Sequence, residues 1–356
     1  MKIPFLFILV LFSPVDSEFC RNTEYLNGRW EPLTPEEAMK KSYPCCAGHA
    51  VSVEHDIPKC QIQNEWPLYG KEMSGKIPRS MGHGCSCIVN ALLDGKITNV
   101  NRLLPIQMYE WRPKGCEMVK WSAKQFCDVL GNRTILMVGD STMQQTAVAL
   151  FSRLVEEQAV CLSQVDFELS DNLVYSPFES RGANLIAQLS KHWSRILIFS
   201  VGPHVLEYAE KQYENRTQDS FMHCFYPKLK FDMEFIRQHL WKPDKIVYKT
   251  QNPGHFGCEA HNAPVDDVAK LQQEHQPSEY EYPWYLGSLV DERMIETLKD
   301  EPGFQVINMS PLDGRPDAHA FQGAPSDSKD CLHYCIPGAL DLFAEILLHK
   351  MFIQEI

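Results

Sequence analysis

The segment TILMVGDST, residues 134–142, joins a short, uninterrupted apolar run to a polar turn. Such a run is expected of a strand that is buried on both faces, as in a parallel sheet. Residues 144–157 follow with apolar side chains at helical spacing, namely Val148, Phe151 and Val155. The segment therefore predicts a buried strand, a tight turn at Gly139-Asp140-Ser141, and a helix.

Three more apolar runs lie further along the chain, at residues 195–201, 245–250 and 304–309. Segments with helical spacing lie between or after them, at residues 231–240, 288–299 and 337–352. Strands separated by helical segments of crossover length predict an α/β fold, with a parallel central sheet that is covered on both faces. Ligands of such sheets bind at the carboxyl ends of the strands, where Ser141 is expected.

The composition is that of an ordinary globular protein, with 44% hydrophobic and 22% charged residues among 356. The net charge of -12 argues against a nucleic-acid partner, which would select basic patches, and against anchoring to anionic lipid.

Residues 1–17 have the features of a secretory signal peptide, with Lys2 before an apolar run and Ser17 at the expected cut. The alternative is a retained signal anchor, but the run from Ile3 to Phe12 is too short to cross ~30 Å of hydrocarbon as a helix. We therefore expect cleavage and no stable membrane insertion afterwards.

All thirteen cysteines follow that cut, so disulfides are expected, and the odd number leaves one thiol free or paired between chains. Glycosylation sequons at Asn132, Asn215 and Asn308 fit a glycoprotein of the Golgi lumen or the extracellular space. Residues 18–125 are rich in cysteine and show little periodicity, which predicts a disulfide-stapled segment rather than an independent core. Residues 126–356 form the predicted α/β domain.

Ser141 is the candidate nucleophile. Its Oγ would lie at the carboxyl end of the strand, and its N–H in the first turn of a helix, where donors lack intrahelical acceptors. One residue can then supply both the attack and part of an oxyanion hole. The alternative is that Asp140 and Ser141 only cap the helix. The chain contains no G-x-S-x-G, so the turn is not an α/β-hydrolase elbow.

The candidate base is His333, in a polar turn framed by Cys331 and Cys335. Asp330, three residues earlier, can hold Nδ1–H of His333 and leave Nε2 to accept the serine proton. If oxidised, the two cysteines would hold this loop from both sides. The alternatives are a zinc site formed by Cys331, His333 and Cys335, and a purely structural loop.

Three further polar clusters follow the other predicted strands, at residues 200–204, 250–256 and 315–319. Each alone is typical of a turn, but together they bring more donors to the edge expected to carry Ser141 and His333. Their candidate substrate or oxyanion residues are Gly202, His204, Asn252, His255, Arg315 and His319.

Gly139-Asp140-Ser141 early in the chain and Asp330-x-x-His333 late in it resemble the SGNH/GDSL superfamily. An ordered set of motifs over about residues 20–350 more closely resembles the PC-esterase family, which includes trichome-birefringence-like polysaccharide O-acetyltransferases. These motifs are Asn27-Gly28-Arg29-Trp30, Tyr109-Glu110-Trp111-Arg112-Pro113-x-x-Cys116, Phe126, His255, Arg315-x-Asp317-Ala318-His319 and Asp330-Cys331-x-His333-x-Cys335-x-Pro337-Gly338.

The resemblance implies a three-layer α/β/α SGNH-like domain with the cysteine-rich part packed on it. It also implies that Ser141, activated by His333 and oriented by Asp330, takes an acetyl group from a donor and passes it to a glycan hydroxyl. No metal and no bound cofactor are implied. A carbohydrate esterase or deacetylase, in which water is the acceptor, and a non-catalytic glycan-binding protein are the alternatives.

The family commonly has Asn-x-Gly-His after the second strand, where this chain has Ser200-Val201-Gly202-Pro203-His204. For the oxyanion hole, the resemblance favours the N–H groups of Ser141 and Gly202, with His204, Gly182 or Asp140 nearby. One disulfide pairing consistent with the family ties Cys331 or Cys335 to the N-terminal part and the other to Cys258.

Overall fold

A parallel sheet forms the centre of the protein, as its computed structural model shows. Its five strands are arranged in the order β4-β3-β5-β6-β7, and each neighbouring pair is parallel. They are β3 (Ile135–Gly139), β4 (Val165–Leu169), β5 (Ile196–Phe199), β6 (Lys245–Lys249) and β7 (Phe304–Ile307). The structure describes residues 19–34, 37, 109–170, 195–200, 243–269, 271, 287–319, 331–335 and 338–356.

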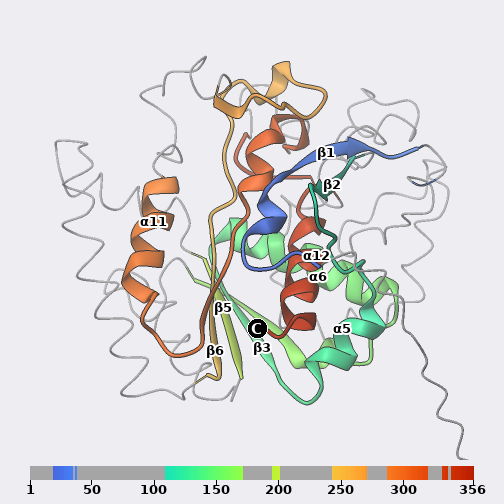
Figure 1. Cartoon of the computed structure of the whole chain (residues 1–356), viewed down its shortest axis with the longest axis vertical. Coiled ribbons are helices and arrows are strands. Elements are labelled where there is room, and N and C mark those ends of the chain that lie inside the picture. The colour runs from blue at the N-terminus through green and yellow to red at the C-terminus, as the bar shows by residue number, and fades with distance from the viewer. Residues whose placement is uncertain are drawn as a thin grey trace, which may run out of the picture.

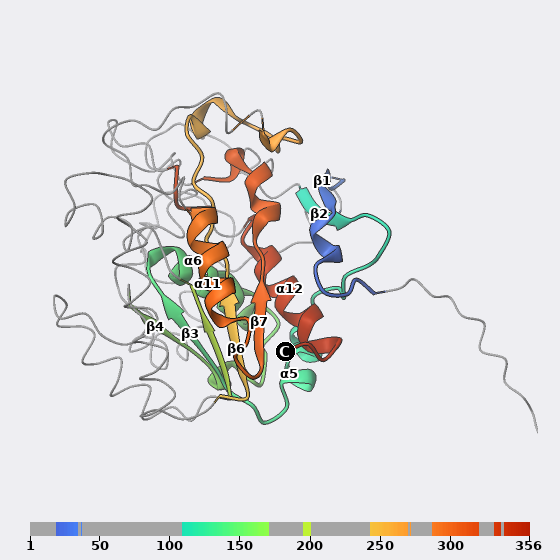
Figure 2. The same ribbon diagram turned by 60° about the vertical axis from the view of Figure 1, so that its left-hand side comes forward.

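Helices cover both faces of this sheet (Figures 1 and 2). Helix α11 (Gly287–Leu298) lies on one side, whereas α5 (Ala123–Leu130), α6 (Ser141–Glu156) and α12 (Asp341–Phe352) pack together on the other. Helix α12 is buried along nearly its whole length, which explains its apolar sequence. The predicted three-layer α/β architecture with a parallel central sheet is confirmed.

Four of the strands were predicted, and their bounds are at most two residues shorter at either end. Strand β4 was not predicted, because Asp166 and Glu168 interrupt its apolar residues at an edge of the sheet. Helix α5 was also not predicted, and it spans the expected boundary between residues 125 and 126. The predicted helix over residues 231–240 lies outside the described residues.

The N-terminal part contributes a second, two-stranded sheet, in which β1 (Gly28–Pro32) pairs antiparallel with β2 (Tyr109–Pro113). A disulfide between Cys20 and Cys116 closes this part, as expected of a stapled segment. Tyr25 and Trp111 belong to the same apolar core as β3 and α12, and the indole of Trp111 donates to the carbonyl of Tyr25 at 2.7 Å. The N-terminal part therefore shares its core with the α/β domain.

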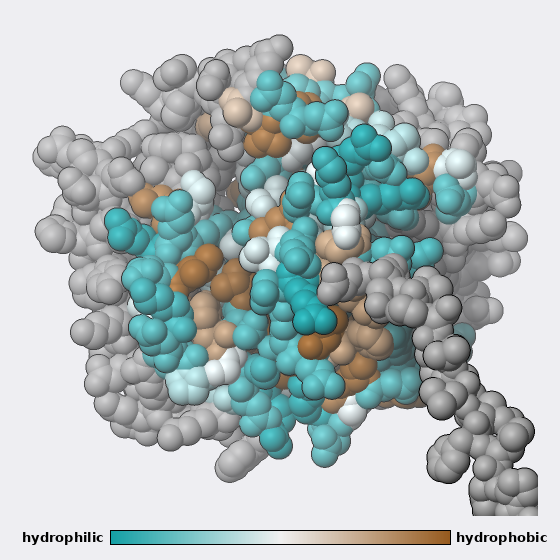
Figure 3. Space-filling model, in the orientation of Figure 1, coloured by the Kyte–Doolittle hydropathy of each residue, from teal (hydrophilic) through white to brown (hydrophobic). Residues whose placement is uncertain are grey.

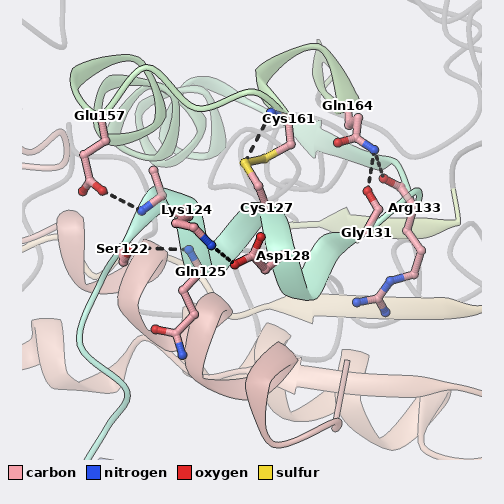
Figure 4. Close-up of a disulfide and its surroundings, with 11 residues drawn as sticks. Ser122, Lys124, Gln125, Cys127, Asp128, Gly131, Arg133, Glu157, Cys161 and Gln164 are labelled. Atoms are coloured by element: carbon pink, nitrogen blue, oxygen red, sulfur yellow. Dashed lines mark hydrogen bonds and ion pairs between the residues drawn. A yellow bond between two sulfur atoms is a disulfide. The ribbon is translucent and has the colours of Figure 1, made fainter.

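Helix α5 is held at its N-terminus and at its middle (Figure 4). Its N-cap Ser122 accepts a hydrogen bond from the N–H of Gln125, and Glu157 accepts the N–H of Ala123 at 2.8 Å. In the middle of the helix, Cys127 is bound to Cys161, which follows α6. The disulfide thus ties α5 to the segment between α6 and β4.

The face of the described surface seen in Figure 3 is mainly hydrophilic, with hydrophobic side chains showing beside α11. No helix in the described part of the chain is long and apolar enough to span a bilayer. The expected signal peptide, residues 1–17, lies outside the described residues.

Candidate active site

The turn after β3 presents Ser141 at the first position of α6. Asp140 is fully buried and caps this helix, because its Oδ1 accepts the N–H of Thr142 at 2.9 Å and the Thr142 hydroxyl at 2.7 Å. The same oxygen lies 3.4 Å from the N–H of Met143. Asp140 therefore caps the helix, which was one alternative for this turn. The side chain of Ser141 is not needed as the cap.

Gly139 makes this turn sterically feasible. A Cβ atom at this position would overlap the Cβ of Met143 and would lie 3.1 Å from the carbonyl oxygen of Ser200. Strand β3 can therefore approach both its own helix and the end of β5 only with glycine here. The close approach puts Ser141 at the carboxyl edge of the sheet.

His333 meets Ser141 at this edge. Its Nε2 lies 2.8 Å from Oγ of Ser141, although the two residues are 192 positions apart in sequence. Both side chains are half-buried. An unprotonated Nε2 at this distance can accept the hydroxyl proton, which is the geometry required of a base that activates a nucleophile.

The first turns of α6 also hold the main chain beside His333. Gln145, one turn after Ser141, accepts the N–H of Tyr334 at 2.9 Å and donates its amide to the Tyr334 carbonyl at 2.8 Å. Ser141 and Gln145 belong to the same helix. The two hydrogen bonds of Gln145 therefore fix the position of the base, His333, relative to the nucleophile, Ser141. We did not predict this role of Gln145, because a glutamine at helical spacing carries no specific signal.

Disulfides hold the same loop. Cys258 is bound to Cys331, which is one half of the family-based expectation, and Cys335 is also in a disulfide. Zinc binds deprotonated cysteine thiolates, and neither loop cysteine has a free thiol. The zinc alternative for Cys331, His333 and Cys335 is therefore excluded.

Two buried histidines, His255 and His319, form a chain of contacts that leads to the main chain of the His333 loop. Burial lowers the pKa of His255 to about 4, so this ring is neutral near pH 7. Its Nε2–H then donates to the carbonyl of Asp313 at 2.8 Å, and its Nδ1 accepts from Nε2 of His319 at 2.6 Å. Nδ1 of His319 lies 3.0 Å from the carbonyl oxygen of His333. Through its two ring nitrogens, His319 thus connects His255 to the main chain of His333.

The other described candidates for substrate binding are each held by contacts within the protein. The amide of Asn252 donates to the carbonyl of Thr142 at 3.1 Å, which ties the segment after β6 to the start of α6. Arg315 is fully buried, pairs with Asp317 and stacks on Trp30, so it lies within the protein rather than at the edge. Ser200 follows β5 directly and has a buried hydroxyl without a hydrogen-bond partner among the described residues. Asp330, Gly182, Gly202, His204 and Asn215 lie outside the described residues.

Two of the three sequons and several cysteines lie among the described residues. Asn132 is exposed, and Asn308 is half-buried, with its side-chain oxygen accepting the N–H of Ser310 at 2.8 Å. Three disulfides join described cysteines, as an oxidising compartment would allow.

Comparison with known proteins shows which family the chain resembles. The PC-Esterase family, described as a GDSL/SGNH-like acyl-esterase family found in Pmr5 and Cas1p, matches residues 182–350. This stretch includes His333 and begins after Ser141. The resemblance to the PC-esterase family is confirmed.

The PC-esterase match is accompanied by distant relatives in Arabidopsis thaliana. Protein trichome birefringence-like 23 is 22% identical over 84% of this chain and 82% of its own length. Protein trichome birefringence-like 24 is 21% identical over 97% and 93%, respectively. Xyloglucan O-acetyltransferase 1 is 21% identical over 68% of this chain and 70% of its own length.

Among solved structures, a carbohydrate acetylesterase from Sinorhizobium meliloti is similar at 12% identity, with 63% of this chain and 100% of that chain covered. The TM-score of 0.31 is too low to support any inference from it. The resemblance to an acyl-esterase family therefore rests on the sequence matches.

Proposed function

We propose that this protein is an O-acetyltransferase that moves an acetyl group onto a glycan hydroxyl through an acetylated serine. The observation that carries the proposal is the 2.8 Å contact between Nε2 of His333 and Oγ of Ser141 at the carboxyl edge of the sheet. It is supported by the relative named as a xyloglucan O-acetyltransferase. The donor is a second substrate that carries the acetyl group as an ester or thioester.

In the first half-reaction, His333 Nε2 removes the hydroxyl proton of Ser141 while Oγ attacks the acetyl carbonyl carbon. The bond to the leaving group breaks, and this group takes the proton from Nε2. In the second half-reaction, a sugar hydroxyl gives its proton to Nε2 and attacks the acetyl-serine. The sugar ester leaves, and Oγ recovers the proton. Asp330 would orient His333 through Nδ1 in both steps.

The negative charge that develops on the acetyl oxygen needs donors. The N–H of Ser141 is suited to this role, because the N–H groups of the next three residues of α6 already have acceptors on Asp140. A free N–H at the first position of a helix lies where the helix dipole favours negative charge. The N–H of Gly202, with His204 or Gly182, would complete the hole.

Hydrolysis uses the same residues, because only the acceptor differs. Water must therefore be outcompeted by a positioned sugar for transfer to prevail. The family description as acyl-esterases makes a carbohydrate esterase the second candidate function. In either case we propose a glycan as the partner and the lumen of the secretory pathway or the extracellular space as the location.

Ser141→Ala tests the proposal. The protein is incubated with p-nitrophenyl acetate, and its intact mass is measured after a rapid quench. We expect the mass of one acetyl group on the wild-type protein, located on Ser141 by peptide mapping, and none on Ser141→Ala. His333→Ala should reduce the rate of acetylation by at least about 100-fold, in the range that general-base catalysis contributes. Acetylation that persists in Ser141→Ala, or is absent from the wild-type protein, would contradict the mechanism.

A further inference from the structure

A cleft of about 520 Å³ lies at the carboxyl edge of the sheet, between the start of α11 and the segment that follows β6. Its volume is in the range of small-molecule sites. Gln251, Asn252 and His255 line one wall. Asp291 and Glu292 of α11 line the opposite wall. None of these residues takes part in the proton transfers proposed above.

The walls of the cleft contact the neighbours of both catalytic residues. The amide of Asn252 donates to the carbonyl of Thr142, the residue after Ser141. The ring of His255 contacts His319, which lies 3.0 Å from the carbonyl oxygen of His333. A ligand in the cleft therefore lies at the same edge of the sheet as the nucleophile and the base.

Gln251 offers an unused donor. Its side chain is 7% exposed, and its Nε2 has no hydrogen-bond partner among the described residues. A buried donor without a partner costs the free protein about 1–3 kcal/mol, which a ligand that accepts this hydrogen bond would recover. A Cβ atom on Gly287 would lie 3.3 Å from Oε1 of Gln251, so the glycine lets this amide lie close to the start of α11.

The charge of the cleft selects the class of ligand. Asp291, Glu292 and Asp313 contribute carboxyl groups to the cleft, and none of the described residues that line it is a lysine or arginine. An anionic ligand, such as a phosphorylated donor, would find no cationic partner among these residues. A metal ion is not favoured either, because the one group of described side chains close enough to share an ion is Cys258, Glu259 and Cys331, and its cysteines are in a disulfide.

A neutral sugar satisfies these groups. A sugar hydroxyl can accept a hydrogen bond from the Gln251 amide, and another can donate one to the exposed carboxylate of Glu292. Phe256, Leu271 and Ile295 add apolar surface, against which the C–H groups of a sugar ring can pack. We propose that this cleft binds a neutral sugar unit of the acceptor glycan. The cleft is a binding site in its own right, whereas its role as the acceptor site rests on the proposed function.

Binding is measured on Ser141→Ala by saturation-transfer NMR, so that no turnover occurs. The probes are the methyl glycosides of glucose, galactose, mannose, xylose and N-acetylglucosamine, with methyl glucuronide as the anionic counterpart. N-glycans are removed enzymatically beforehand, because Asn308 of a sequon lines the cleft. We expect saturation transfer to at least one neutral glycoside and weaker transfer to the glucuronide.

Two exposed glutamates of α11 provide a matched pair of variants, each made in Ser141→Ala. Glu292 lines the cleft, whereas Glu296, one turn later, does not. Glu292→Trp should fill the mouth of the cleft and abolish the signal, and Glu296→Trp should preserve it. Gln251→Met, which removes the amide but keeps the length of the side chain, should weaken binding about tenfold without lowering the melting temperature.

The outcomes separate this proposal from the proposed function. If no neutral glycoside binds, if the glucuronide binds best, or if Glu292→Trp binds as well as Glu296→Trp, the cleft is not a neutral-sugar site. Acetylation of Ser141 by p-nitrophenyl acetate, measured in the single variants of Glu292, Glu296 and Gln251, reports the catalytic centre independently. Sugar binding without serine acetylation in the wild-type protein would leave the cleft proposal standing and overturn the acetyltransferase.

Discussion

At the scale of single residues, Gln145 is the clearest positioning group of the site. It makes two hydrogen bonds with the main chain of Tyr334 and is itself buried. Gln145→Met would leave a buried N–H and a buried C=O without these partners. We expect kcat for p-nitrophenyl acetate to fall about tenfold or more with little change in KM, because the base is displaced while the substrate still binds.

Two further variants distinguish positioning from general destabilisation. Gln145→Glu can still accept the N–H of Tyr334 but cannot donate to its carbonyl, so its kcat should be intermediate. Gln144→Met is the matched control, because the Nε2 of Gln144 has no hydrogen-bond partner in the described part of the chain. Equal losses of kcat in Gln144→Met and Gln145→Met, or a loss that tracks only the melting temperature, would contradict the positioning role.

The contrast between Ser141 and Gln145 shows what sequence reveals at this scale. Ser141 could be nominated because it follows a buried strand and opens a helix, and His333 because it lies in an unusual cysteine-framed turn. Their meeting was an expectation about the edge of a parallel sheet, and the structure places them 2.8 Å apart. Gln145 could not be nominated, because its partners are main-chain atoms 189 residues away, which no side-chain pattern encodes.

At the scale of elements, the contact between β6 and α11 predicts a dependence of stability on pH. Burial raises the pKa of Asp291 to about 7, in spite of hydrogen bonds from the Tyr248 hydroxyl and the Gln251 N–H. The folded protein thus binds a proton that the unfolded chain releases near pH 4. The free energy of unfolding should therefore fall as the pH rises from about 4 to about 7, by roughly 2–4 kcal/mol from this group.

Asp291→Asn tests this contribution, because an amide resembles the protonated carboxyl and can still accept both hydrogen bonds. Urea unfolding at pH 5 and pH 8 should show a smaller loss of stability in the variant than in the wild-type protein. Burial also raises the pKa of Asp313 to about 6, so part of the dependence should remain. Lys249, buried beside Asp291, has its pKa lowered to about 8, so its titration near pH 8 adds a change of the opposite sign in both proteins. Identical slopes in the two proteins would refute the assignment to Asp291.

The elements that sequence did not predict are those whose apolar pattern is broken or short. Continuous runs identified β3, β5, β6 and β7, because strands buried on both faces need apolar side chains throughout. The edge strand β4 needs them on alternate positions only, and Asp166 and Glu168 fill the others. Helix α5 has eight residues, and its position depends on the Cys127–Cys161 bond, whose pairing the sequence does not reveal.

At the scale of the whole molecule, two disulfides should both contribute to stability, but only one of them should affect kcat. Cys258–Cys331 anchors the loop of His333, whereas Cys127–Cys161 joins α5 to the segment that follows α6. Replacing either pair by serine should cost about 2–4 kcal/mol of stability. We expect only Cys258→Ser/Cys331→Ser to lower kcat per folded molecule, measured with p-nitrophenyl acetate well below the melting temperature. Equal kcat values for the two double variants would contradict the anchoring role.

The N-terminal part should unfold together with the α/β domain, because Arg315 links the two. Arg315 pairs with Asp317 inside the protein, and its guanidinium carbon lies 4.6 Å from the ring centre of Trp30 and 5.3 Å from that of Tyr109. The indole N–H of Trp30 also donates to the carbonyl of Pro311 at 2.7 Å. The stacking of Trp30 on this buried cation and its hydrogen bond together contribute about 2–4 kcal/mol to the free energy of unfolding.

Trp30→Phe and Trp30→Ala should therefore lower the stability of the whole molecule in that order, since phenylalanine retains the stacking but not the hydrogen bond. Unfolding in urea is followed by tryptophan fluorescence and by far-ultraviolet circular dichroism, with the disulfides intact. We expect one transition with the same midpoint by both methods, which shifts to lower urea in each variant. If the N-terminal part were a separate unit, Trp30→Ala would move an early fluorescence transition and leave the later loss of helix signal unchanged. A shared core requires both signals to move together.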